Sequence, residues 1–163
     1  MGRAAEGTRD CAMKENDVAP EHGAAPGEPV SITSGTDLVL PSTAGEARAH
    51  VRTLLTTAFR SRSKRPVDEV LLADVLLVTS ELVTNAMRHG GGLTGFDAVL
   101  TDAGLLLNVA DASADPPVVT DPARRGTDGA GGFGWPLICR LAGHVAITPR
   151  PDGKQITALI PLD

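Results

Sequence analysis

The clearest feature of the sequence is a long segment whose apolar residues recur at helical spacing. It extends from about Val67 to His89, and the three glycines that follow, Gly90 to Gly92, would end a helix. At about 100° per residue, one face of this helix carries Leu72, Leu76, Thr79, Val83 and Ala86. The segment therefore predicts a long helix with one face packed against a core.

Shorter patterns before and after this helix predict the remaining elements. Leu38 to Leu40 is apolar and ends at a proline, which indicates a short strand. Thr43 and Glu46 have the spacing of a capping box, and the apolar residues after them predict a helix to about Phe59. Later segments predict two hairpins with a helix between them: 94–101 with 105–111, then 134–143, then 145–148 with 155–161.

This order of elements predicts an α/β fold. It suits a two-layer sandwich, in which a mixed, mostly antiparallel sheet carries helices on one face. Residues 1–35 are rich in Gly, Ala, Pro and acidic residues, so we interpret them as a disordered leader before a single domain at 36–163. The long connection at 112–131 is typical of a lid or a binding loop, whereas the basic segment 60–66 is more simply a solvated connector.

Composition and charge narrow the class of protein. Aromatic residues make up only 2% of the chain, so the core is predicted to consist of Leu, Val, Ala and Ile. The net charge of −5 argues against direct binding of nucleic acid, which requires a basic surface. Two cysteines, no signal-peptide core and no segment of membrane-spanning length predict a cytoplasmic protein without disulfides and without a membrane contact.

Four side chains near the end of the long helix could carry chemistry. Glu81, Asn85, Arg88 and His89 lie opposite its apolar face, and taken alone this pattern favours an amphipathic helix with a solvated side. The second interpretation is a phosphate site. Asn85 offers a neutral oxygen that suits Mg²⁺, and Glu81, one turn earlier, could accept a proton from water or a hydroxyl group. Arg88 and His89 could approach phosphate or simply lie on the surface.

Two further segments have a functional and a structural interpretation. Asp111 ends a strand, where it could cap a turn. It could instead accept a hydrogen bond from the exocyclic amine of adenine, whereas guanine has a carbonyl oxygen at the equivalent position. The glycines from Gly129 to Gly134 precede a helix and could turn backbone N–H groups toward a phosphate, or could form a flexible surface loop. They match neither a Walker loop nor a dinucleotide fingerprint, since no GK[ST] follows and no strand directly precedes them.

Together these segments resemble the motifs of the histidine-kinase-like ATPases. ELVTNAMRHG, from Glu81 to Gly90, is similar to the N box of that family. Asp111 with ASADPP resembles the first glycine box, and GGFGWPLICRLAG at 131–143 resembles the second, in the order that the family has. The resemblance covers Leu38 to Leu162, and the segment LVTSELVTNAMRHG is most similar to the small anti-sigma-factor serine kinases.

The resemblance implies a fold, two ligands and a set of site residues. The fold would be the Bergerat ATP-binding fold, with ATP and Mg²⁺ as cofactors. Asn85 would hold Mg²⁺, Glu81 would polarise the attacking hydroxyl or water as the catalytic residue, and Asp111 would bind the adenine. The remaining binding positions would be Gly132 and Gly134 in the phosphate loop, Thr157 near the adenine, and Arg88 and His89.

The resemblance also implies two competing functions. The first is a regulatory serine/threonine kinase that binds a sigma factor, phosphorylates an anti-sigma factor antagonist and could form a homodimer. The second is a module that binds ATP or sequesters a partner without phosphoryl transfer. Departures from the family favour this alternative, because Phe133 replaces an Arg and Trp135 a Leu, and both could cover the nucleotide or face a partner. A sensor histidine kinase fragment is disfavoured, since His50 is not followed by an acidic residue.

Overall fold

The computed structural model describes residues 40–62, 66–117 and 134–162. In chain order, this part contains α1 (Ala44–Arg62), α2 (Glu69–His89), β1 (Leu93–Thr101), β2 (Gly104–Asp111), α3 (Gly134–Leu141), β3 (His144–Arg150) and β4 (Gly153–Ile160). The predicted leader at 1–35, most of the predicted strand at 38–40 and the loop residues 118–133 lie outside the described residues.

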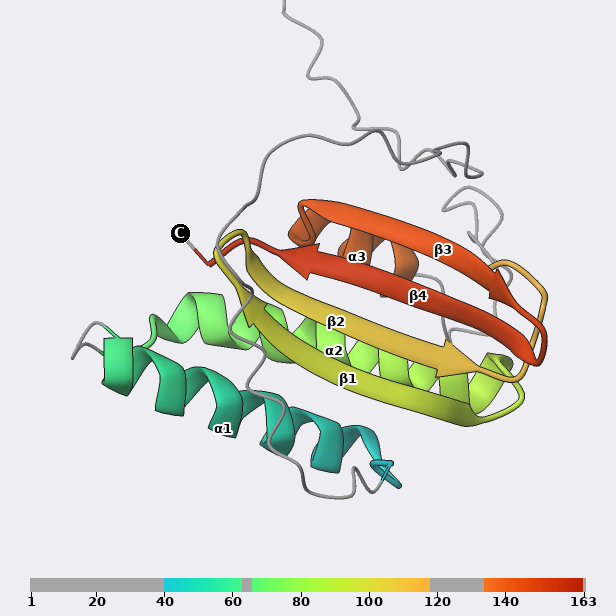
Figure 1. Cartoon of the computed structure of the whole chain (residues 1–163), viewed down its shortest axis with the longest axis horizontal. Helices are drawn as coiled ribbons and strands as arrows, with labels where there is room; N and C mark the ends of the chain where they lie inside the picture. Colours follow the sequence, from blue (N-terminus) through green and yellow to red (C-terminus); the bar gives the residue numbers. More distant parts are fainter. Residues whose placement is uncertain (1–39, 63–65, 118–133, 163) are drawn as a thin grey trace, which may run out of the picture.

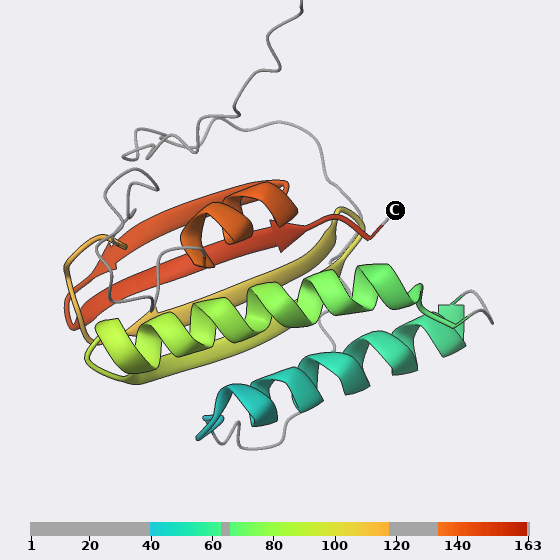
Figure 2. The same cartoon turned by 180° about the vertical axis from the view of Figure 1, so that it is seen from behind.

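The four described strands form one sheet in the order β1-β2-β4-β3, and each neighbouring pair is antiparallel (Figure 1). After β2 the chain forms α3 and returns along the sheet edge as β3, so β4 is inserted between β3 and β2. The three described helices lie on one face of the sheet (Figure 2). The predicted two-layer α/β sandwich is confirmed, and the described sheet contains only antiparallel pairs.

Alternation along the central strands decides which side chains face the helices. The odd-numbered residues of β2 from Leu105 to Asp111 and the even-numbered residues of β4 from Lys154 to Ile160 are buried. Side chains from all three helices complete the core against them, among them Val51, Leu55, Leu82, Val83 and Ile138. On the other face, which carries no described helix, most side chains of β2 and β4 are only partly buried: Leu106, Asn108, Gln155, Thr157 and Leu159.

The central helix α2 has a defined beginning and end. The Asp68 carboxylate caps its start by accepting hydrogen bonds from the backbone N–H groups of Val70 and Leu71, both at 3.0 Å. At its end, the N–H group of Gly90 donates to the carbonyl oxygens of Asn85 and Ala86 at 3.0 and 3.1 Å. These caps fix where the helix ends relative to the sheet, which matters because the end of α2 borders the candidate site.

The apolar content of α2 calls for one correction. By length and composition alone, Glu69–His89 is long and apolar enough to cross a membrane, so the expectation that no segment approaches this length is wrong. In the folded chain, however, seven residues of α2 are buried among α1, α3 and the sheet, including Val75, Val78 and Leu82. Packing inside the domain thus accounts for the apolar face of this helix.

Candidate functional site

Glu81 and Asn85 lie one turn apart in the C-terminal half of α2, and both side chains are partly buried. The Glu81 carboxylate reaches the first residue of α3, because a Cβ atom added to Gly134 would lie 2.3 Å from Glu81 Oε2. The unpaired N–H groups at a helix start favour a carboxylate there. The missing side chain of Gly134 therefore allows Glu81 to lie at the N-terminus of α3.

Asp111 lies at the other end of the same region, against Gly90, the residue that caps the end of α2. Its side chain is only 4% exposed, and a Cβ atom added to Gly90 would lie 2.4 Å from Asp111 Cγ. The backbone N–H of Ala112 also donates to the carbonyl oxygen of Gly92 at 3.3 Å. The end of β2 and the end of α2 are thus in direct contact, which places Asp111 beside the helix that carries Glu81 and Asn85.

Lys154 belongs to this site and was missed by sequence reasoning. Its Nζ atom forms an ion pair with Asp111 Oδ1 at 2.9 Å and donates a second hydrogen bond to the Ser113 carbonyl oxygen at 3.1 Å. The sequence held one signal for it. Lys154 falls on the same alternation as Ile156 and Ala158 in β4, so a charged residue stands at a position of the buried face.

Arg88 and His89 are both exposed in the last turn of α2. Cations are favoured there by the partial negative charge of the helix C-terminus, which gives them a structural reason to lie where they do. Of the two glycines expected in the phosphate loop, Gly134 begins α3, whereas Gly132 lies outside the described residues. The roles of these four residues remain predictions.

Thr157 is not brought together with the other site residues. It lies on the open face of the sheet, where its hydroxyl group donates to Asn108 Oδ1 at 2.8 Å. Asp111, by contrast, is an odd-numbered residue of β2 and faces the helices. Thr157 and Asp111 therefore lie on opposite faces of the sheet, because successive strand residues point to opposite faces, and the residue beside Asp111 is Lys154. The role of Thr157 near an adenine stays a prediction.

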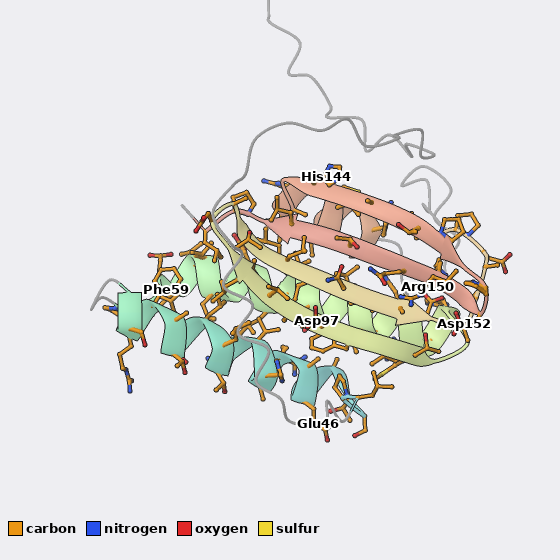
Figure 3. All side chains as sticks on the ribbon, viewed as in Figure 1. Glu46, Phe59, Asp97, His144, Arg150 and Asp152 are labelled. Atoms are coloured by element: carbon orange, nitrogen blue, oxygen red, sulfur yellow. The ribbon has the colours of Figure 1, made fainter. Side chains whose placement is uncertain are left out.

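A hydrogen-bonded row of polar side chains surrounds Thr157 on this open face. Asn108 Nδ2 contacts Asp97 Oδ2 at 3.5 Å, and Gln155 Nε2 donates to Asn108 Oδ1 at 3.3 Å. Gln155 in turn accepts a hydrogen bond from the Arg150 guanidinium group. Asp97 and Arg150 mark the two sides of this row in Figure 3, on the face that the helices do not cover.

Trp135 lies in the hydrophobic core of the domain. Its side chain is 8% exposed and belongs to the hydrophobic core together with Ile138. It lies in the first turn of α3, and its burial leaves little of its surface to contact a nucleotide or a partner. The replacement of Leu by Trp at this position is therefore a change of core packing, whereas Phe133 lies outside the described residues.

Comparison with known families now adds to this geometry. A family model described as "Histidine kinase-like ATPase domain" matches residues 43–160. The chain belongs to this family. The matched range contains every described helix and strand, and it includes Glu81, Asn85, Asp111 and Lys154. Membership of the histidine kinase-like ATPase family agrees with the ATP-binding interpretation of the site.

Three of the solved structures that match this chain are histidine kinases or a domain of one. The histidine kinase domain of the blue-light activated kinase EL346 from Erythrobacter litoralis is 18% identical, with a TM-score of 0.44 over 74% of this chain and 65% of that domain. A longer form of EL346 gives the same identity and TM-score over 71% of this chain and 42% of that protein. The histidine kinase AdeS from Acinetobacter baumannii is 17% identical, with a TM-score of 0.42 over 74% of this chain and 66% of AdeS.

The chain therefore spans less than two thirds of each of these proteins. A comparison with curated proteins finds no match.

Proposed function

We propose that this chain binds Mg-ATP between the C-terminal half of α2, the start of α3 and the end of β2. The observation that carries the proposal is the burial of Asp111 against Gly90. Gly90 directly follows α2, the helix that carries Glu81. Gly90 follows Glu81 by nine positions along the chain, a helical rise of about 13 Å. A nucleoside triphosphate is long enough to extend from one end of this region to the other.

The residues along this region suit the successive parts of the nucleotide. Asp111, buried and acceptor-only, would receive the exocyclic amine of adenine. The start of α3, opened by Gly134, would face the phosphates with its backbone N–H groups. Arg88, exposed at the end of α2, would contribute positive charge nearby, and the exposed His89 ring would offer a hydrogen-bonding nitrogen.

Magnesium would be held by Asn85 together with the phosphates. In the described part of the chain, no group of three or more His, Cys, Asp or Glu residues could hold a metal ion. The Asn85 amide oxygen as a single protein ligand fits Mg²⁺, which usually takes one or two protein ligands and fills its other positions with water and substrate phosphate. When bound, the ion would neutralise phosphate charge, and the Asn85 amide oxygen would do so without repelling the nucleotide.

For the chemical step we propose phosphoryl transfer to a serine or threonine of a protein partner. The partner's hydroxyl oxygen would attack the γ-phosphorus, the bond to the bridging oxygen would break, and ADP would leave. Glu81 would accept the hydroxyl proton. Such a reaction depends mainly on positioning and charge neutralisation, which a small domain can supply.

The partner would be an anti-sigma factor antagonist, and the same chain would bind a sigma factor, as in partner switching that regulates transcription. This part of the proposal is supported by the N-box segment from Leu77 to Gly90, which resembles the anti-sigma-factor serine kinases. A cytoplasmic location and a homodimer belong to the same proposal. A module that binds ATP without transfer is the competing function, and Phe133 in place of Arg favours it because it supplies no charge near the phosphates.

A transfer assay with a Glu81→Gln variant tests the proposed chemistry. With labelled ATP and a co-purified antagonist, we expect the variant to lose at least about 100-fold in transfer rate, the usual contribution of a general base. Its affinity for ATP should stay within twofold of the native value, about the scatter of such a measurement. Glu69→Gln, in the exposed first turn of the same helix, removes the same charge and should change neither quantity.

The outcomes of this assay separate the two functions. Loss of transfer with retained ATP binding supports the kinase. Tight ATP binding without transfer in the native chain supports the non-catalytic module instead, and transfer that survives Glu81→Gln shows that Glu81 is not the base.

An Asn85→Ala variant tests the metal assignment. We expect the affinity for ATP in the presence of Mg²⁺ to fall by about tenfold or more, because a direct oxygen ligand of the ion is lost. Asn108→Ala removes the same amide from the open face of the sheet and should leave the affinity unchanged. Equal affinities of Asn85→Ala and the native chain, measured by calorimetric titration, would show that Asn85 does not hold the ion.

A further inference from the structure

We propose that Lys154 is a positioning residue for nucleobase recognition. Its ammonium group binds Oδ1 of Asp111 and leaves Oδ2 to accept a hydrogen bond from the exocyclic amine of adenine. The inference rests on the proposed function of Asp111 and concerns a residue that the proposed function does not itself require. Its basis is the geometry of the buried ion pair between β2 and β4.

The hydrogen bonds around Asp111 are unequally distributed over its two oxygens. In the described part of the chain, Oδ1 receives both Lys154 Nζ at 2.9 Å and the backbone N–H of Ser113 at 3.0 Å. Lys154 Nζ also donates to the Ser113 carbonyl oxygen at 3.1 Å, which closes a ring of three contacts. Oδ1 is thus held by two donors that are themselves fixed.

The second oxygen faces α2. A Cβ atom added to Gly90 would lie 2.5 Å from Asp111 Oδ2, so this oxygen lies directly beside the end of the helix that carries Asn85. A carboxylate oxygen can only accept hydrogen bonds. Oδ2 is therefore an acceptor with one fixed direction, which suits an amine and disfavours a carbonyl oxygen at the same atom of the base.

The position of Lys154 in the sheet explains how it can act on Asp111. The two residues are direct partners in the antiparallel pairing of β2 with β4, and both side chains point to the helix face. Among the described residues they are the two buried charged side chains: the Lys154 side chain is 7% exposed and the Asp111 side chain 4%. A buried ion pair adds little stability compared with apolar residues of similar size, so its main consequence here is to orient the carboxylate.

Removal of the ammonium group should therefore change base selectivity more than phosphate binding. Without Lys154 the carboxylate keeps only the Ser113 N–H and can rotate, so its acceptor loses its fixed direction. Inosine triphosphate is the informative probe, since it carries a carbonyl oxygen in place of the amine and an N1–H group in place of the unprotonated N1 of adenine. Its binding depends on the same phosphate and ribose contacts but gains nothing from an acceptor aimed at the position of the amine, where it has a carbonyl oxygen.

The experiment compares ATP and inosine triphosphate on the full chain with Mg²⁺, in native protein and in Lys154→Met. We expect native protein to prefer ATP, and Lys154→Met to lose at least about tenfold in ATP affinity, the range of one hydrogen bond to a charged group. The affinity for inosine triphosphate should stay within about twofold, about the scatter of a titration, so that most of the preference disappears. Lys154→Arg, which keeps a charged donor, should restore much of it.

Two further variants make the comparison robust. Arg150→Met removes one positive charge from the same hairpin, but on the open face, and should leave both affinities unchanged. Lys154→Gln, whose shorter neutral side chain cannot form the ion pair, serves in place of Lys154→Met if that variant does not fold. It is expected to lose the preference in the same way.

Each outcome bears on one of the two proposals. If native protein binds neither nucleotide, the proposed function fails, and the role of Lys154 fails with it. If native protein prefers ATP and Lys154→Met or Lys154→Gln keeps that preference, only the role of Lys154 is overturned. Tighter binding of ATP by these variants would overturn it as well, because Lys154 would then compete with the amine for Asp111.

Discussion

The missing side chain at Gly90 allows Asp111 to lie against the end of α2. A Cβ atom at this position would lie 2.4 Å from Asp111 Cγ and 2.6 Å from its Cβ, distances that atoms cannot keep. The φ angle of Gly90 is −93°, which any residue can adopt, so the requirement for glycine is steric. An alanine would have to push the carboxylate away from the helix.

Gly90→Ala should therefore impair ATP binding as well as stability. We expect urea denaturation to show a loss of about 1–3 kcal/mol, as for overpacking elsewhere, and ATP affinity to fall by about tenfold. The matched control is Gly45→Ala in α1, where an added Cβ atom would meet its nearest neighbour, Thr43 Oγ1, at an ordinary 3.5 Å. If Gly90→Ala binds ATP as the native chain does, Asp111 does not read the base from its present position.

At the level of residues, the sequence predicted part of the site. Glu81, Asn85 and Asp111 could be proposed because each combines a chemical type with a motif. Lys154 could not be proposed from a motif, since its role depends on which residue of β4 lies opposite Asp111, and that register is set by the whole sheet. The same register places Thr157 opposite Asn108, on the open face of the sheet.

The stability of α2 depends in part on its first turn. Asp68 accepts two backbone N–H groups there, and its replacement by Ala should cost about 1 kcal/mol in the free energy of unfolding. The cap lies at the opposite end of the helix from Asn85 and Gly90, so ATP affinity should not change. Denaturation by urea, with and without saturating ATP, measures both quantities.

The outcome that would contradict this assignment is specific. An Asp68→Ala variant with native stability would show that the cap contributes nothing to α2. Weaker ATP binding in a variant that remains folded would show that the two ends of the helix are coupled.

At the level of elements, hydrophobic spacing predicted the helices and hairpins to within two or three residues. The long helix was expected at 67–89 and extends from Glu69 to His89, because Asp68 caps it. The contact between α3 and Glu81 could not be foreseen, since it depends on how α3 packs beside α2 after a connection of more than 20 residues. Local patterns define elements, whereas contacts between distant elements arise from tertiary packing.

At the level of the whole molecule, the two faces of the sheet have different roles. One face carries the helices, the core and the candidate site, while the other carries the polar row from Asp97 to Arg150 (Figure 3). Family membership agrees with ATP binding, which we propose for the helix face. The proposal therefore makes a prediction about which face responds to the nucleotide.

An NMR titration of the labelled full chain with Mg-ATP measures that response residue by residue. We predict saturable shifts for the backbone amides of Glu81, Asn85, Gly90, Asp111 and Gly134, with little change at Asn108 and Thr157 on the open face. Saturable shifts confined to the open face, or no saturable shift at millimolar nucleotide, would contradict an ATP site between α2, α3 and the end of β2.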